Sequence, residues 1–206
     1  ILTETNDAKY YLSELNNINL NTFNWLDGHW QSPKYFEHYK QLLQKELMPP
    51  KPISEKFLKV GEKMIVEESV AIGLRLYEEE PKEILVKNSK IKKSFEINNA
   101  INKIKKKISN VNFYLFCTKN DKFLEELELP KNTMKITAEN GFEDAVNTLW
   151  LLSRCKHHVI TSSTFYWWGA WFSSKFYQAS NQTIYSDYIE NRDGLPKNWN
   201  KINYID

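Results

Sequence analysis

Three consecutive hydroxyl side chains, Ser162, Ser163 and Thr164, form the part of the sequence best suited to holding an anion. They follow a short apolar run and precede residues 165–172, where six of eight positions are aromatic. This pattern predicts a buried strand, a short loop and then a buried helix. Because the first turn of a helix leaves backbone N–H groups unpaired at its positive end, hydroxyls there can share these donors with a bound oxyanion. Plain helix capping is the alternative, and the residues alone leave it open.

Arg75 is the charged residue best suited to binding an oxyanion. The chain has 28 basic residues, of which only Arg75, Arg154 and Arg192 are arginine, and Arg75 lies inside an apolar, strand-like run. A guanidinium can form two parallel hydrogen bonds to a phosphate or carboxylate, which a lysine cannot do. We therefore expect Arg75 to hold an anion, with a salt bridge to a neighbouring glutamate as the alternative.

The histidines and cysteines do not have the spacing of a metal site, since the sequence contains neither an HxH nor a CxxC motif. His157 and His158 border an apolar run and are more typical of packed, hydrogen-bonded core residues. Cys117 and Cys155 lie in or beside apolar runs and are expected to be buried, reduced thiols.

The elements that would position these residues alternate between strands and helices from residue 66 onward. We expect strands at 69–77, 111–118, 134–137, 158–161 and 183–185, and helices at 96–108, 121–127, 142–152 and from 164. This alternation predicts an α/β fold with a Rossmann-type parallel sheet flanked by helices over residues 66–206. Ligands bind such sheets at the carboxyl ends of the strands, so Arg75, Thr118 and the three hydroxyls should share one rim.

Residues 1–65 are expected to form a separate, mostly helical and partial lobe. The apolar spacing predicts helices at 33–47 and 54–65, and prolines at 48–52 break the chain between them. The sequence begins without a methionine or a signal-like segment, from which we expect a cytoplasmic protein that is part of a longer chain.

The overall composition is that of an ordinary globular protein, with 206 residues, 41% hydrophobic and 26% charged. A net charge of +2 argues against nucleic acid as a partner. The region from Lys90 to Lys107 is rich in lysine, which is typical of a solvated helix face. The alternative for this region is peripheral contact with an anionic membrane surface.

Four segments carry a family resemblance, in this order: DGHWQSPKYF (27–36), AIGLRLYEE (71–79), NFYLFCTKND (112–121) and EDAVNTLWLLSRCKHHVITSSTFYWWGAW (143–171). The fourth is long and specific. Together they resemble the bacterial α-1,2-fucosyltransferases of glycosyltransferase family 11. The glycine-rich segment with which that family begins is absent from this sequence.

The resemblance implies a two-lobed, GT-B-like fold and transfer of fucose, with inversion, from GDP-fucose to a galactose-type hydroxyl of a glycan. It implies no required metal or other cofactor. Arg75 would hold the leaving diphosphate, helped by Ser162, Ser163 and Thr164, and Glu78 would be the general base.

The remaining site residues are also assigned through the resemblance. Glu143 and Asp144 would accept hydrogen bonds from the guanine edge, although carboxylates in a first helical turn are favoured by the helix dipole alone. Thr118 would contact the ribose or base, and Trp30 and Gln31 would face the sugar acceptor.

The segment around Arg75 departs from the family pattern H-x-R-R-G-D. Gly73 stands in place of the histidine, Leu76 in place of the second arginine, and Tyr77 and Glu78 in place of the glycine and aspartate. Two alternatives therefore stay open: a non-catalytic relative that binds nucleotide or glycan, and a transferase that uses another nucleotide sugar.

Overall fold

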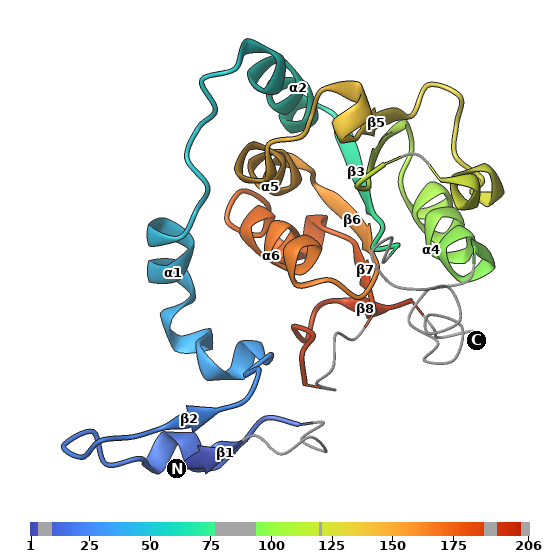
Figure 1. Cartoon of the computed structure of the whole chain (residues 1–206). Helices are drawn as coiled ribbons and strands as arrows, with labels where there is room; N and C mark the ends of the chain where they lie inside the picture. Colours follow the sequence, from blue (N-terminus) through green and yellow to red (C-terminus); the bar gives the residue numbers. More distant parts are fainter. Residues whose placement is uncertain (4–9, 77–93, 120, 188–192, 203–206) are drawn as a thin grey trace.

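The computed structural model describes residues 1–3, 10–76, 94–119, 121–187 and 193–202 (Figure 1). Its centre is a six-stranded sheet in the order β5-β4-β3-β6-β7-β8, with every neighbouring pair parallel. The strands are β3 (Glu68–Gly73), β4 (Val111–Phe116), β5 (Met134–Ile136), β6 (His157–Ile160), β7 (Ile184–Ser186) and β8 (Asn200–Lys201). The sheet grows from β3 in one direction to β5 and then from β6 in the other. This is the strand order of a dinucleotide-binding Rossmann sheet, and its switch point lies between β3 and β6.

Helices cover both faces of the sheet, as the strand–helix alternation predicted (Figure 1). Helix α4 (Ser94–Lys107) covers one face, and α2 (Glu55–Val66), α5 (Ala145–Arg154) and α6 (Thr164–Ser173) cover the other. Alternate residues of β3 serve the two layers, because successive side chains of a strand point to opposite faces. Val70 and Ile72 pack in the cluster that includes Ile101 of α4, whereas Ala71 packs in the cluster that includes Trp150 of α5.

The aromatic segment forms α6, and its burial confirms that most of it is core. Trp167 and Trp171 are buried, and Trp168 packs at the edge of the same cluster. A Cβ atom at Gly169 would lie 2.5 Å from the Cβ of Leu152, so the missing side chain allows α6 to approach α5 closely.

Several boundaries differ from those expected. Strand β3 ends at Gly73, and α5 begins only after Asp144. The expected helix over 33–47 is divided into two 3-10 turns, Pro33–Tyr35 and Glu37–Tyr39, followed by α1 (Lys40–Glu46). Phe36 interrupts the helix, with φ −137° and ψ 12°. Its ring stacks on that of Trp168, with the two ring centroids 5.6 Å apart. Contact with α6 therefore overrides the helical periodicity of this segment. Residues 121–127 likewise form a 3-10 turn, Lys122–Glu126, rather than an α-helix.

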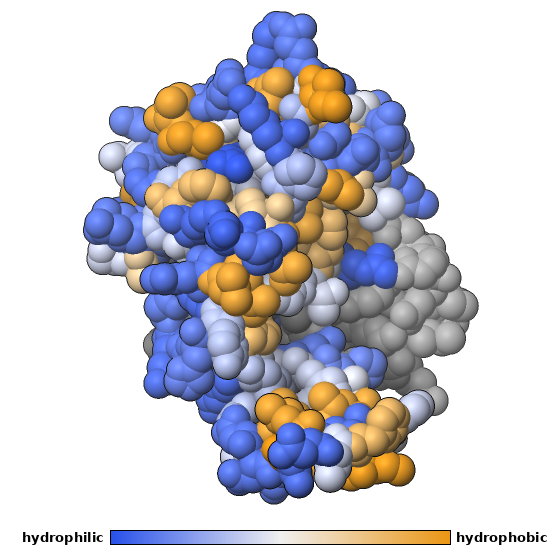
Figure 2. Space-filling model, turned by 90° about the vertical axis from the view of Figure 1, so that its left-hand side faces the viewer, coloured by the Kyte–Doolittle hydropathy of each residue, from blue (hydrophilic) through white to orange (hydrophobic). Residues whose placement is uncertain are grey.

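The N-terminal segment contains two short strands that the sequence did not predict, β1 (Leu2–Thr3) and β2 (Leu26–Asp27), paired in parallel, and a 3-10 turn, Ser13–Asn17. Figure 2 shows apolar side chains gathered on this part of the surface. Leu20 and Phe23 of this segment are 83% and 89% exposed. Helix α1, which follows this segment, is joined to α6 through Gln44, whose Nε2 donates to the carbonyl of Trp171 at 2.9 Å. A domain boundary after residue 65 stays a prediction.

None of the helices in the described ranges is long and apolar enough to cross a bilayer.

His157 and His158 are buried at the start of β6, where the core interpretation placed them. Nε2 of His158 lies 3.0 Å from the carbonyl oxygen of Cys155 and 3.0 Å from the hydroxyl of Ser173. Burial lowers the pKa of His158 to about 3. The imidazole is therefore neutral in the folded protein at neutral pH.

Mild acid should destabilise the fold through His158. Its folded pKa is depressed, so between pH 6.5 and pH 3 the unfolded chain binds a proton that the folded chain does not. The contribution of neutral His158 to the free energy of unfolding is fully present above pH 6.5. On acidification below that pH it falls by about 1.4 kcal/mol per pH unit. Urea unfolding should thus show a loss of about 2 kcal/mol between pH 7 and pH 5. A His158→Gln variant, although less stable, should lose less over the same interval. Equal slopes in the two proteins would contradict the assignment.

Candidate active site

A cavity of about 410 Å³ opens at the carboxyl ends of the strands on the two sides of the switch point. Arg75 follows β3, Thr118 follows β4, and Ser163 and Thr164 follow β6, and all four line this cavity. The common rim expected from the parallel sheet is therefore present. Arg75 and the loop that carries Ser163 and Thr164 line the same cavity.

The backbone that carries Arg75 is held by hydrogen bonds from neighbouring elements. The Arg75 N–H donates to the Thr161 hydroxyl oxygen at 2.7 Å, and the Thr161 N–H donates to the carbonyl of Gly73 at 2.9 Å. The Tyr166 hydroxyl donates to the carbonyl of Leu74 at 3.1 Å. The segment just past β3 is thus fixed by β6 and α6, while the Arg75 side chain stays partly exposed at the cavity.

Gly73 allows Tyr166 to form part of the cavity wall. A Cβ atom at position 73 would lie 2.7 Å from Cγ and 2.9 Å from Cδ1 of the Tyr166 ring. Such distances are shorter than real contacts, so the ring occupies the space that a larger residue would need. Glycine at position 73 therefore accommodates this tyrosine.

The first turn of α6 faces the cavity without a side-chain cap. Ser163 is the N-cap residue of this ten-residue helix, but its side chain makes no capping hydrogen bond. The plain capping alternative is therefore wrong for Ser163. Ser163 and Thr164 line the cavity at the start of this helix, where the helix dipole favours negative charge.

The other expected site residues are divided between lining and structural positions. Glu143 lines the cavity and is exposed. Asp144 does not line it, and its Oδ1 accepts from the Asn147 N–H at 2.7 Å as the N-cap of α5. Ser162 lies beside Ser163 but is not among the lining residues. Glu78 lies outside the described residues.

A second cavity of about 150 Å³ adjoins the first. Thr164 lines both cavities, and Trp30 and Gln31 line the second one. The stacked rings of Phe36 and Trp168 form another part of its wall. Trp30 and Gln31, which were expected to face an acceptor, therefore line the cavity that adjoins the one lined by Arg75.

Two features of this second cavity are typical of a binding site. The Oε1 atom of Gln31 is buried without a hydrogen-bond partner, which is uncommon for a buried polar atom. Trp30 has φ 52°, a left-handed conformation that costs free energy in a residue other than glycine.

The structure adds three residues that sequence reasoning did not single out. Thr161 and Tyr166 were counted as strand and core, yet they hold the backbone around Arg75. His29 lines the second cavity and is the one histidine among its lining residues. The position of His29 directly before Trp30 was the available signal.

Among the residues that the structure describes, no group of three or more histidine, cysteine, aspartate or glutamate side chains could hold a metal ion.

Comparison with known proteins assigns the family. Residues 13–203 match glycosyl transferase family 11. The chain belongs to that family. It is also similar to an alpha-1,2-colitosyltransferase from Escherichia coli, at 25% identity over 147 residues, which are 70% of this chain and 49% of that relative. The chain thus spans about half the length of this curated family 11 relative. No solved structure matches the chain.

Membership of family 11 confirms the resemblance carried by the four sequence segments. It places the uncapped α6 turn and Arg75 in a protein family named for glycosyl transfer. The sheet edge that carries them is the edge at which Rossmann folds bind nucleotides.

Proposed function

We propose that this chain provides the nucleotide-sugar side of a glycosyltransferase that uses GDP-fucose as donor and a galactose-type hydroxyl of a glycan as acceptor. The observation that carries the proposal is the shared cavity of Arg75 and the uncapped first turn of α6. A guanidinium on one side, and hydroxyls and helix N–H groups on the other, are complementary to a diphosphate. Family membership and the relative support glycosyl transfer itself.

In this proposal the large cavity receives the nucleotide. The diphosphate lies between Arg75 and Ser163–Thr164. Glu143 lies at the same cavity and would accept the two adjacent N–H groups of a guanine edge. Thr118 follows β4 and would contact the ribose.

The second cavity is the proposed acceptor site. Its aromatic walls suit the apolar face of a sugar ring, and Trp30 and Gln31 line it as expected of acceptor-side residues. Because Thr164 lines both cavities, the acceptor would meet the donor sugar beside the diphosphate.

Inverting transfer then needs one displacement. The acceptor oxygen forms a bond to the anomeric carbon as the bond from that carbon to the diphosphate breaks. GDP leaves with the electron pair, and Arg75 together with the α6 N–H groups stabilises the charge that develops on it. The proton of the acceptor hydroxyl passes to a base, for which His29 and Glu78 are the candidates.

The Escherichia coli relative is named for colitose rather than fucose, so a different sugar on the nucleotide is the specific alternative. A non-catalytic relative that binds nucleotide is the second alternative. Calorimetry with GDP beside a donor-hydrolysis assay separates a transferase from a non-catalytic relative, since GDP binding without donor turnover supports the non-catalytic relative. Failure to bind any nucleotide would overturn the proposal.

Removing the two cavity hydroxyls should weaken GDP binding without unfolding the protein. Each hydroxyl would donate one hydrogen bond to a charged phosphate oxygen, so Ser163→Ala with Thr164→Ala should raise the GDP Kd by roughly tenfold or more. Calorimetry measures the change. Ser174→Ala, which removes a hydroxyl from the far end of the same helix, is the matched control. Unchanged GDP affinity in the double variant would show that these hydroxyls do not touch the diphosphate.

A cytoplasmic location and peripheral membrane contact through the region from Lys90 to Lys107 stay predictions. Lys90, Lys92 and Lys93 lie outside the described residues. In α4, Lys105 donates to the carbonyl of Glu128 and Lys107 donates to the Thr183 hydroxyl, so two of the lysines contact neighbouring elements.

A further inference from the structure

A third cavity, of about 340 Å³, lies at the opposite edge of the sheet from the proposed donor site. It is lined where strands begin: Glu68 is the first residue of β3, His157 the first of β6, and Thr183 directly precedes β7. Lys107, the last residue of α4, and Lys156 complete the charged part of its wall. We call this space the amino-edge pocket.

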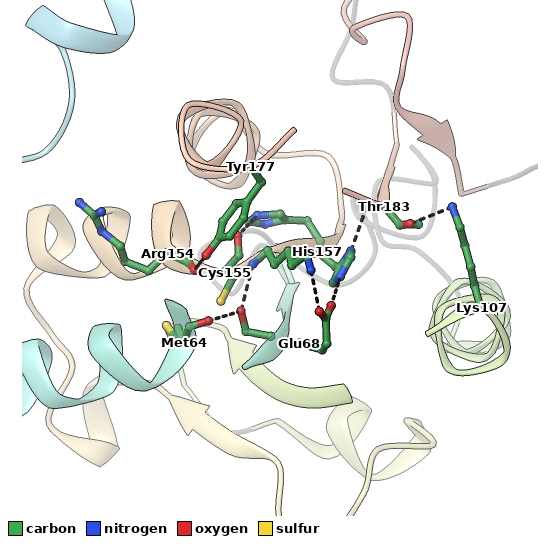
Figure 3. Close-up of polar contacts among 11 residues, drawn as sticks. Met64, Glu68, Lys107, Arg154, Cys155, His157, Tyr177 and Thr183 are labelled. Carbon is green, nitrogen blue, oxygen red and sulfur yellow. Dashed lines mark hydrogen bonds and ion pairs between the residues drawn. The ribbon is translucent and has the colours of Figure 1, made fainter. Parts of the chain in front are cut away.

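Glu68, Lys156 and His157 form a neutral group. Nδ1 of His157 accepts a hydrogen bond from the Thr183 N–H at 3.0 Å, so the ring proton is on Nε2, which donates to Glu68 at 2.9 Å. The other oxygen of Glu68 accepts from Lys156 Nζ at 2.6 Å (Figure 3 shows Glu68 beside His157). Burial lowers the pKa of His157, and hydrogen bonds from Lys156 and His157 lower the pKa of Glu68. The carboxylate is therefore charged, the imidazole is neutral, and Lys156 balances Glu68.

Lys107 brings a positive charge that this group does not balance. Its Nζ donates to the Thr183 hydroxyl oxygen at 3.1 Å, and no described carboxylate lies within ion-pair distance of it (Figure 3). A lysine in the last turn of α4 is favoured by the helix dipole, but Lys105 and Lys106 already supply that charge. The dipole therefore does not explain why Lys107 reaches across to Thr183.

Thr183 is a second lining residue with hydrogen-bonding capacity. It is 3% exposed, and because its oxygen accepts from Lys107, its own hydroxyl proton remains for another acceptor. The side-chain amide of Asn181 adds further donors to the lining. The pocket thus combines one surplus cation with several hydrogen-bond donors, while both oxygens of its carboxylate are already occupied.

We propose that the amino-edge pocket is a second ligand site that binds a small phosphate-bearing anion through Lys107, Thr183 and Asn181. Phosphate suits this set because it carries the opposite charge and several acceptor oxygens. The site is separate from the proposed donor cavity, since the two lie at opposite ends of the same strands. Its existence does not depend on the proposed function.

The test is titration of the full chain with inorganic phosphate at constant ionic strength, followed by calorimetry and thermal unfolding. We expect saturable binding that Lys107→Gln weakens by about tenfold, the loss of one charge-assisted hydrogen bond. Thr183→Val, which keeps the N–H bond to His157, should weaken it as well. Lys106→Gln removes the same charge from the neighbouring position and should leave the affinity unchanged.

A further variant shows which cavity is occupied. Arg75→Ala should remove any phosphate held at the proposed donor cavity and leave the Lys107-dependent binding intact. Loss of the Lys107-dependent binding in Arg75→Ala, equal losses in Lys106→Gln and Lys107→Gln, or no saturable binding at all would each overturn the proposal.

The source of the phosphate is distinguished by two arms, glycerol 3-phosphate in solution and phosphatidylcholine vesicles that contain phosphatidic acid. Tighter, Lys107-dependent binding to the first indicates a soluble phosphate ester. Tighter, Lys107-dependent binding to the second indicates a lipid headgroup. Binding that Lys107→Gln leaves unchanged in both experiments would overturn the proposal.

Discussion

Replacing Arg75 with alanine should lower the affinity for GDP by about a hundredfold and abolish transfer while leaving the fold intact. The guanidinium would form two charge-assisted hydrogen bonds to the diphosphate, together worth about 3 kcal/mol. The backbone around it should not move, because its contact with Thr161 uses the Arg75 N–H, which alanine retains. Calorimetry with GDP measures the affinity, and circular dichroism verifies the fold.

Arg75→Lys is the informative companion, since it keeps the charge and removes the planar fork. We expect an affinity between those of the wild-type protein and the alanine variant. Transfer by Arg75→Ala within about tenfold of wild type, a barrier change below about 1.4 kcal/mol, would show that this residue does not stabilise the leaving group.

Adding a single methyl group at Gly73 should destabilise the protein and disturb the proposed donor site together. The new Cβ would lie 2.7 Å from the Tyr166 ring and 3.1 Å from Cγ2 of Ile160, at the carboxyl end of strand β3. Overpacking of this kind costs about 1–3 kcal/mol, so Gly73→Ala should unfold at a clearly lower urea concentration. Displacement of Tyr166 would also release the carbonyl of Leu74 beside Arg75, so GDP affinity should fall as well.

A double-mutant cycle attributes this effect to the tyrosine ring. In a Tyr166→Leu background the methyl group at position 73 should cost less than in the wild-type protein, by at least about 0.5 kcal/mol. If the two substitutions were additive, the contact between Gly73 and Tyr166 would not be the source of the strain.

The positions that bring the candidate site together could be predicted because parallel sheets impose them. Arg75 lies near the end of the expected strand 69–77, Thr118 ends the expected strand 111–118, and Ser163 follows an apolar run. The carboxyl ends of parallel strands meet at one edge. Local pattern was therefore enough to place these three at one cavity before any distance was known. The long segment around Ser163 also indicated the family, which the match over residues 13–203 confirms.

Contacts between distant segments could not be predicted in the same way. The periodicity of residues 33–47 is helical, but Phe36 leaves the helix in order to stack on Trp168, more than a hundred residues later. Tyr166 resembles its buried aromatic neighbours in sequence, and only its position over Gly73 makes it part of the cavity wall. Asp144 fits either a cap or a ligand, and the bond to Asn147 decides for the cap.

The amino-acid sequence alone thus determined the α/β class, the parallel sheet and the sheet edge, at the carboxyl ends of the strands, where a ligand can bind. It could do so because strand and helix periodicities are local properties. The tertiary structure decided which polar groups remain unsatisfied at that edge. Ser163 without a capping bond and Gln31 with an unpaired oxygen are results of packing, and packing depends on neighbours that are far apart in the sequence. It also decided that Lys107 meets Thr183 at the opposite edge, a pairing across 76 positions that no local pattern contains.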